Sequence, residues 1–122
     1  MEASVLSVIN EEMTSLGLAY EYGEFAGKLT YPYIVGEFSE DDYIFEDNST
    51  GGEMILTAFN RGKEIDLISI KEAIKKKFRD YRKTVDGGTM SIVYERKLFI
   101  RSGEDALQKM EIRLTIKYWE GV

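Results

Sequence analysis

The feature that most constrains the fold is the strict alternation of apolar and polar residues over residues 110–119. The apolar members are Met110, Ile112, Leu114, Ile116 and Tyr118. The positions between them are Glu111, Arg113, Thr115 and Lys117, and the series closes on Trp119. Because side chains alternate across a strand, the pattern predicts one buried and one polar face, as in an antiparallel sheet. Trp119, on the polar side, is a candidate interface anchor.

The rest of the chain shows helical spacing in two places and strand-like runs between turn clusters. Helices are predicted at about Ala3–Leu16 and about Leu67–Arg82, the second capped by Asp66 or, one turn later, by a Ser69–Glu72 capping box. Strands are predicted at Leu18–Tyr22, Tyr31–Phe38, Glu53–Asn60 and Thr89–Ile100. Pro32 is expected at a strand start or on an edge, and the isomer of the Tyr31–Pro32 bond is left open. We therefore expect a single α+β domain over 1–122, with one antiparallel sheet and two helices packed on one face.

The absence of two residue types excludes several kinds of chemistry. The 122 residues include no His and no Cys, so a Ser-His-Asp or Cys-His system, thiol chemistry and a Cys/His zinc site are all excluded. The remaining carboxylates lie in hydrophilic stretches, where nothing predicts the burial that tunes a catalytic pKa. We expect no enzyme activity, catalytic residue, cofactor or bound metal. No apolar run reaches the ~20 residues of a membrane helix, and Met1–Ser4 lacks a basic start, so a soluble intracellular domain is expected.

Charge is distributed unevenly along the chain. Residues 1–61 hold two basic and 12 acidic residues, whereas residues 62–122 hold 14 basic and 10 acidic ones, so the formal net charge of -6 combines -10 with +4. The acidic candidates for a subunit interface or a channel lining are Glu37, Glu40, Asp41, Asp42, Glu46 and Asp47. The basic candidates, predicted as one flank of the second helix, are Lys71, Lys75, Arg79 and Arg82.

Opposite charges on separate surfaces of one small domain suit head-to-tail contacts between identical subunits, which close into rings or continue as filaments. Two alternatives stay open. The charges could simply be a solvated loop and a solvated helix face, and the acidic stretch could bind a divalent cation through its oxygens. Nucleic-acid binding is disfavoured because the domain is acidic overall and its aromatic residues lie among acidic ones.

The sequence resembles the small tail terminator or tail completion proteins of long-tailed bacteriophages (siphophages) and prophages. The resemblance covers nearly the whole chain. It rests on the short N-terminal helix, Tyr31–Glu37, Phe45–Asp47, Asn60–Gly62, the helix around Leu67–Ile74, and the final strand ending in Tyr118-Trp119. No single one of these motifs is diagnostic.

The resemblance implies a virion structural protein without catalytic residues. Such proteins form a hexameric ring on the head-proximal end of the tail tube, assembled in the host cytoplasm, and take part in head-tail joining. The implied partners are further copies of the chain, the tail tube protein and head-tail connector proteins. DNA would only pass through the channel, without specific binding, and no membrane is involved. The alternatives are a head-side connector or stopper protein, and a small dimeric α+β domain that binds a ligand or a protein.

Overall fold

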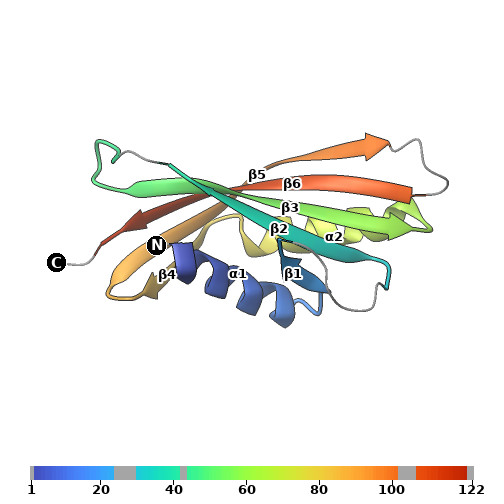
Figure 1. The fold of residues 1–122 in the computed structure, drawn as a ribbon, viewed down its shortest axis with the longest axis horizontal. Coiled ribbons are helices and arrows are strands. Elements are labelled where there is room, and N and C mark those ends of the chain that lie inside the picture. Colours follow the sequence, from blue (N-terminus) through green and yellow to red (C-terminus); the bar gives the residue numbers. More distant parts are fainter. Residues whose placement is uncertain (1, 24–29, 42–43, 102–106, 121–122) are drawn as a thin grey trace.

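The computed structural model describes residues 2–23, 30–41, 44–101 and 107–120. These residues form two helices and six strands, arranged as in Figure 1. In chain order they are α1 (Glu2–Ser15), β1 (Tyr20–Tyr22), β2 (Tyr33–Glu40), β3 (Thr50–Arg61), α2 (Glu64–Lys77), β4 (Tyr81–Val85), β5 (Gly88–Arg101) and β6 (Leu107–Trp119). The Tyr31–Pro32 peptide bond is cis, and Pro32 directly precedes β2.

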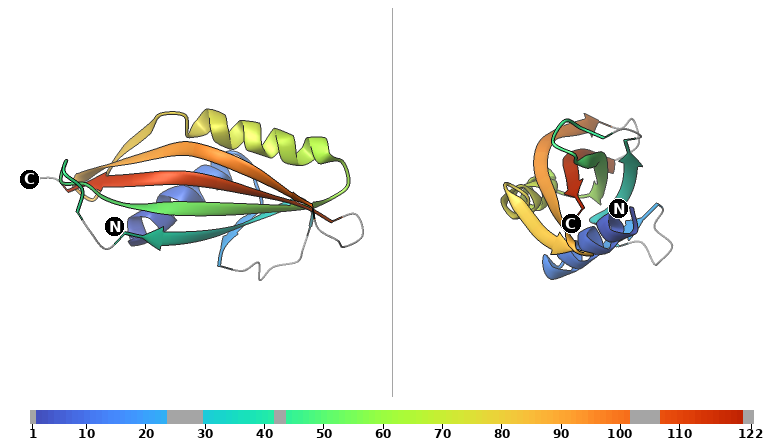
Figure 2. Two further views of the ribbon diagram at one scale, coloured as in Figure 1. Left: turned by 90° about the horizontal axis from the view of Figure 1, so that it is seen from above. Right: turned by 90° about the vertical axis from the view of Figure 1, so that its left-hand side faces the viewer.

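The strands form one curled sheet in the order β1-β2-β3-β6-β5-β4, visible in both views of Figure 2. All neighbouring pairs are antiparallel except β1 and β2, which pair parallel from Tyr20↔Ile34 to Tyr22↔Gly36. The prediction of a single antiparallel sheet is therefore wrong, because this sheet is mixed. The physical reason is the length of residues 23–32, which lets β2 start from the same end of the sheet as β1, as a hairpin turn would not.

The long strands set the dimensions of the sheet. β3 and β6 pair without interruption from Thr50↔Tyr118 to Arg61↔Leu107. β5 lies on the other side of β6, and its register shifts between Tyr94 and Arg96. This shift is a β-bulge, which inserts an extra residue and redirects side chains locally.

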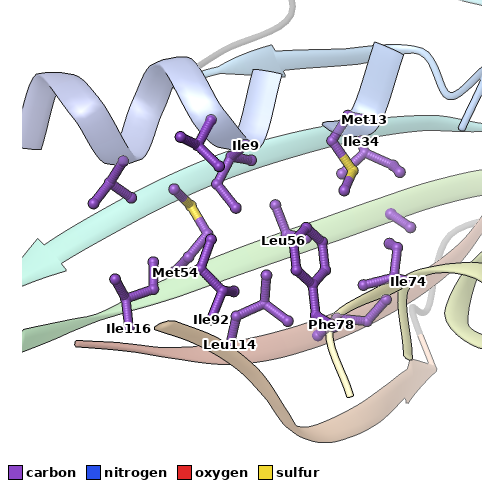
Figure 3. Close-up of a cluster of buried hydrophobic side chains, with 14 of the residues drawn as sticks. Ile9, Met13, Ile34, Met54, Leu56, Ile74, Phe78, Ile92, Leu114 and Ile116 are labelled. Atoms are coloured by element: carbon purple, nitrogen blue, oxygen red, sulfur yellow. The ribbon is translucent and has the colours of Figure 1, made fainter. Parts of the chain in front are cut away.

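The core lies on one face of the sheet, which we call the covered face. The apolar residues of the alternating strand, Met110 to Tyr118, all point into it, as do Met54, Leu56 and Ala58 of β3. Figure 3 shows Ile9 and Met13 of α1 directed at these strands from one side. Ile74 of α2 and the following Phe78 approach from another side, and all of these side chains belong to one buried cluster. Burial of each large apolar side chain contributes ~1.5–3 kcal/mol, so this face holds the fold together.

The second helix differs from its predicted bounds at both ends. It runs over Glu64–Lys77 instead of Leu67–Arg82, and its N-cap is Lys63, without a side-chain cap hydrogen bond, instead of Asp66. The chain then enters β4, a strand that the sequence analysis missed. Asp86 and Gly87 both have positive φ angles (51° and 79°), which form the tight hairpin turn joining β4 to β5. This hairpin takes residues 81–85 out of the helix and into the sheet.

Candidate functional site

The face of the sheet opposite the core, which we call the outer face, carries the polar half of each strand's alternation. Neither described helix lies over it, because the buried residues of α1 and α2 both join the cluster on the covered face. The register places Glu37, Ile55, Arg113 and Arg96 in one row across this face, from β2 to β5. Acidic and basic side chains therefore lie at opposite sides of the same row.

Ion pairs occupy the middle of the outer face. Arg113 contacts Glu53 on β3 and lies 2.8 Å from Glu111 on its own strand. The hydrogen bond to Glu111 and the nearby Glu53 raise the pKa of Arg113. Thr115 of β6 donates a hydrogen bond of 2.9 Å to Glu95 of the adjacent β5. The positive charge of Arg113 is thus balanced within the chain.

One corner of the outer face is aromatic. Tyr33 and Phe59 stack at 5.0 Å between ring centroids, and Tyr31 lies 5.5 Å from Tyr33. Arg61 lies over the Tyr31 ring at 5.7 Å and Lys109 over the Phe59 ring at 5.5 Å. Burial raises the pKa of Tyr33. These rings are outer-face residues and are not part of the main core, and basic groups accompany them.

The predicted acidic residues gather at the β2–β3 end of the molecule. Glu37 is exposed on β2 opposite Ile55, and Glu40 is exposed at the last position of the strand. The backbone N–H of Asp41 donates to the carbonyl of Gly51 at 2.8 Å. Glu46 is exposed in the connection to β3, whereas Asp42 lies outside the described residues.

Asp47 differs from the other acidic candidates because it has a structural role. Its carboxylate accepts hydrogen bonds from the hydroxyl of buried Ser49 at 2.6 Å and from the Ser49 backbone N–H at 3.1 Å. Lys117 lies 3.5 Å from the same carboxylate. The hydrogen bonds to Ser49, assisted by Lys117, lower the pKa of Asp47. Asp47 therefore stabilises the connection between β2 and β3, and its carboxylate is already engaged by Ser49 and Lys117.

Only two of the four residues of the predicted basic helix flank lie on a helix. Lys71 and Lys75 lie on α2, but α2 ends at Lys77, so Arg79 follows the helix and Arg82 lies on β4. The error arose because residues 78–82 continue the helical spacing of apolar and basic residues, although the chain turns into a strand there.

The basic residues on and after α2 are only partly paired within the chain. Lys71 pairs with Glu72, and Lys71, Lys75 and Arg79 together lower the pKa of that carboxylate. The ammonium of Lys75 lies 5.7 Å from the centre of the Tyr94 ring, which leaves its charge in place.

A polar link that the sequence analysis could not explain joins three elements. Glu12 falls on the apolar stripe of α1, and its carboxylate accepts a hydrogen bond of 2.5 Å from the Tyr81 hydroxyl. Lys77 lies 3.2 Å from the other carboxylate oxygen. Burial alone would raise the pKa of Glu12, but the hydrogen bonds from Tyr81 and Lys77 outweigh it and lower this pKa. Burial and the acceptor Glu12 raise the pKa of Tyr81. The link ties α1 to the end of α2 and to β4.

The described residues line hollows outside the core. A hollow of about 350 Å³ separates the first turns of α1 from β4, and it is crossed by the hydrogen bond from Ser4 to Asp86 and by the ion pair between Lys83 and Glu11. A second hollow of about 170 Å³ lies where β5 bulges beside β6. Its lining is Arg96, Lys97, Leu98, Glu111 and Arg113. Sequence reasoning missed this hollow because a bulge has no signal in the residue pattern here.

In the part of the chain that the structure describes, no group of three or more Asp or Glu side chains gathers at one point to bind a metal. No helix there is long and apolar enough to span a membrane.

Comparison with known proteins identifies no relative. No protein-family model matches the chain, and no curated protein sequence matches it significantly.

Proposed function

We propose that the chain is a non-enzymatic virion structural protein, a tail terminator that caps the tail tube as a ring and joins the tail to the head. The observation that carries the proposal is the separation of unbalanced charge on one small domain. Glu40 and Glu46 are exposed at the β2–β3 end, whereas Arg96 and Lys97 are exposed at the bulge of β5. Opposite charges on two different surfaces favour head-to-tail association of identical subunits.

The distance between these surfaces supports association between copies instead of pairing within one chain. Thr50, at the β2–β3 end, is the register partner of Tyr118, and Arg96 is the partner of Arg113. The five residues from Arg113 to Tyr118 span about 17 Å at the usual rise of a strand. Long side chains cannot bridge this distance, so each surface is available to another molecule.

The resemblance of the sequence to tail terminators supplies the rest of the proposal: the hexameric ring, the tail tube and connector partners, and the head-proximal location. The two faces of the sheet agree with this proposal. The covered face is buried in the core, whereas the outer face is open to contacts with other molecules. A ring protein needs such contacts more than it needs a pocket for chemistry.

The test measures the mass of the protein in solution and its effect on tail tubes. Light scattering behind a sizing column should give a hexamer, or a monomer that becomes a ring on tubes polymerised from the tail tube protein of the same genome. Negative-stain microscopy should show tubes capped at one end. A protein that stays monomeric or dimeric at all concentrations and leaves tubes uncapped would rule the proposal out. Labelling that places it inside the head portal would favour a head-side connector instead.

A further inference from the structure

The bulge of β5 brings together two like charges across the sheet. Arg96 and Arg113 are direct register partners on the outer face. Like charges directly opposite one another destabilise a strand pair unless something negative lies beside them. Glu53 and Glu111 balance Arg113, but the side chain of Arg96 has no hydrogen-bond or ion-pair partner among the described residues. The site is therefore short of negative charge at Arg96.

The bulge hollow, defined by Arg96, Lys97, Leu98, Glu111 and Arg113, also presents an apolar contact. Leu98 is 57% exposed, and the side chain of Lys97, like that of Arg96, has no partner in the described part of the chain. Arg96 and Leu98 share the outer face, whereas Lys97 is the partner of buried Ile112 and its side chain points to the opposite side of β5. An exposed leucine beside an unpaired arginine suits a ligand that combines an apolar group with carboxylates. A free inorganic anion would leave Leu98 in water.

The same molecule carries a segment with that combination. We call it the acidic turn and define it by Glu40, Ile44 and Glu46. Ile44 is 68% exposed, and the carboxylates of Glu40 and Glu46 have no partner among the described residues. Figure 1 shows the end of β2 and the start of β3 at one end of the molecule, whereas the end of β5 and the start of β6 lie at the other end. The turn and the hollow complement each other in charge and in apolar character.

We propose that the bulge hollow of one copy receives the acidic turn of a second copy, with Glu40 and Glu46 against Arg96, and Ile44 against Leu98. The contact joins two different surfaces, so each subunit uses its turn on one side and its hollow on the other. This inference rests on the proposed ring and names the contact that builds it. It differs from the predicted pairing of the acidic segment with the α2 flank, where Lys71 already pairs with Glu72.

The experiment uses two charge-reversed variants of the full chain. The hollow variant is Arg96→Glu, and the turn variant is Glu40→Lys with Glu46→Lys. Each variant alone places like charges in the contact, so assembly should weaken at least about tenfold, measured by sedimentation velocity or by tube capping. An equimolar mixture should assemble again, because every contact between the two variants then joins opposite charges. The matched control is Lys76→Glu, which makes the same change in net charge as the hollow variant at an exposed position on α2 and should assemble like the wild type.

Circular dichroism must show that each variant is folded, and the mixing arm supports the inference further because misfolded chains would not rescue each other. If the wild type assembles and the two variants assemble equally well, the inference is wrong while the proposed function stands. If the wild type neither assembles nor caps tubes, both fail. A labelled DNA duplex serves as the alternative probe. Binding by the wild type that is lost in the hollow variant, with assembly unchanged, would make the hollow a nucleic-acid site and overturn the inference.

Discussion

The covered and outer faces of this sheet use the same strands for different purposes. On the covered face, Leu56, Ile112 and Phe78 are fully buried, and the polar link of Glu12 is partnered on both of its oxygens. On the outer face, Arg113 is balanced, but Arg96 is left without a partner in the described residues. Stability and recognition are thus separated by the alternation of the strands, so substitutions on the two faces should have separable effects.

The largest effect is expected for Phe78→Ala on the covered face. Phe78 is fully buried beside the Tyr81 ring, and it follows α2 at the point where both helices meet the sheet. Removal of the ring leaves a cavity, so the free energy of unfolding should fall by about 3–5 kcal/mol, measured by urea denaturation. The control is Leu98→Ala on the outer face, where the exposed side chain should change stability by less than ~0.5 kcal/mol. Equal losses for the two variants would contradict the division between the faces.

A smaller effect is expected for the polar link on the covered face. Tyr81→Phe removes the hydrogen bond to Glu12 and should cost about 1–3 kcal/mol at neutral pH, because the acceptor is charged and largely buried. Glu11→Gln is the matched control one position away, since Glu11 is exposed and pairs with Lys83 at the surface. It should change stability by less than ~1 kcal/mol.

The same link makes stability depend on pH in a defined direction. The pKa of Glu12 is lowered in the folded state from an ordinary value of 4.5, so its stabilisation is complete above that value and is lost as pH falls below it. The pKa of Tyr81 is raised from 10.0, so its contribution is complete below that value and is lost as pH rises above it. The difference in unfolding free energy between wild type and Tyr81→Phe should therefore be flat at neutral pH and shrink in acid. A difference that grows below pH 4.5 would show that the link is absent.

The covered face was largely predictable from the sequence, whereas the contacts between distant segments were not. The alternation at Met110–Tyr118 and the helical spacing in α1 both follow from local periodicity, and they identify most of the core. The partner of Glu12 is 69 positions away, so no local pattern could reveal it. Tyr81 fits a helical stripe and a strand equally well, and the Asp86–Gly87 hairpin decides in favour of the strand.

Among the candidate surfaces, the acidic segment could be identified from its charge alone. The hydrogen bond of Asp47 with Ser49 and its ion pair with Lys117 could not. The basic residues were assigned to one helix although Arg79 follows α2 and Arg82 lies on β4, and charge counting could not show that Lys71 pairs with Glu72. Arg96 and Lys97 sit at a register shift between strands, which depends on how β5 meets β6. The parallel pairing of β1 with β2 is likewise a property of the assembled sheet.

The smallest effect on stability is expected on the outer face, for Arg113→Met. The variant removes two ion pairs from a part-exposed position, where such pairs contribute little, and the methionine keeps some of the apolar contact. Urea denaturation in low and high salt should show only a small loss of stability, reduced further by salt because exposed charges are screened. Assembly should weaken less in Arg113→Met than in the hollow variant, because Arg113 is already balanced by Glu53 and Glu111, whereas Arg96 is not. If Arg113→Met instead unfolds the chain, its ion pairs stabilise the sheet as strongly as the core does, and the separation between the two faces fails.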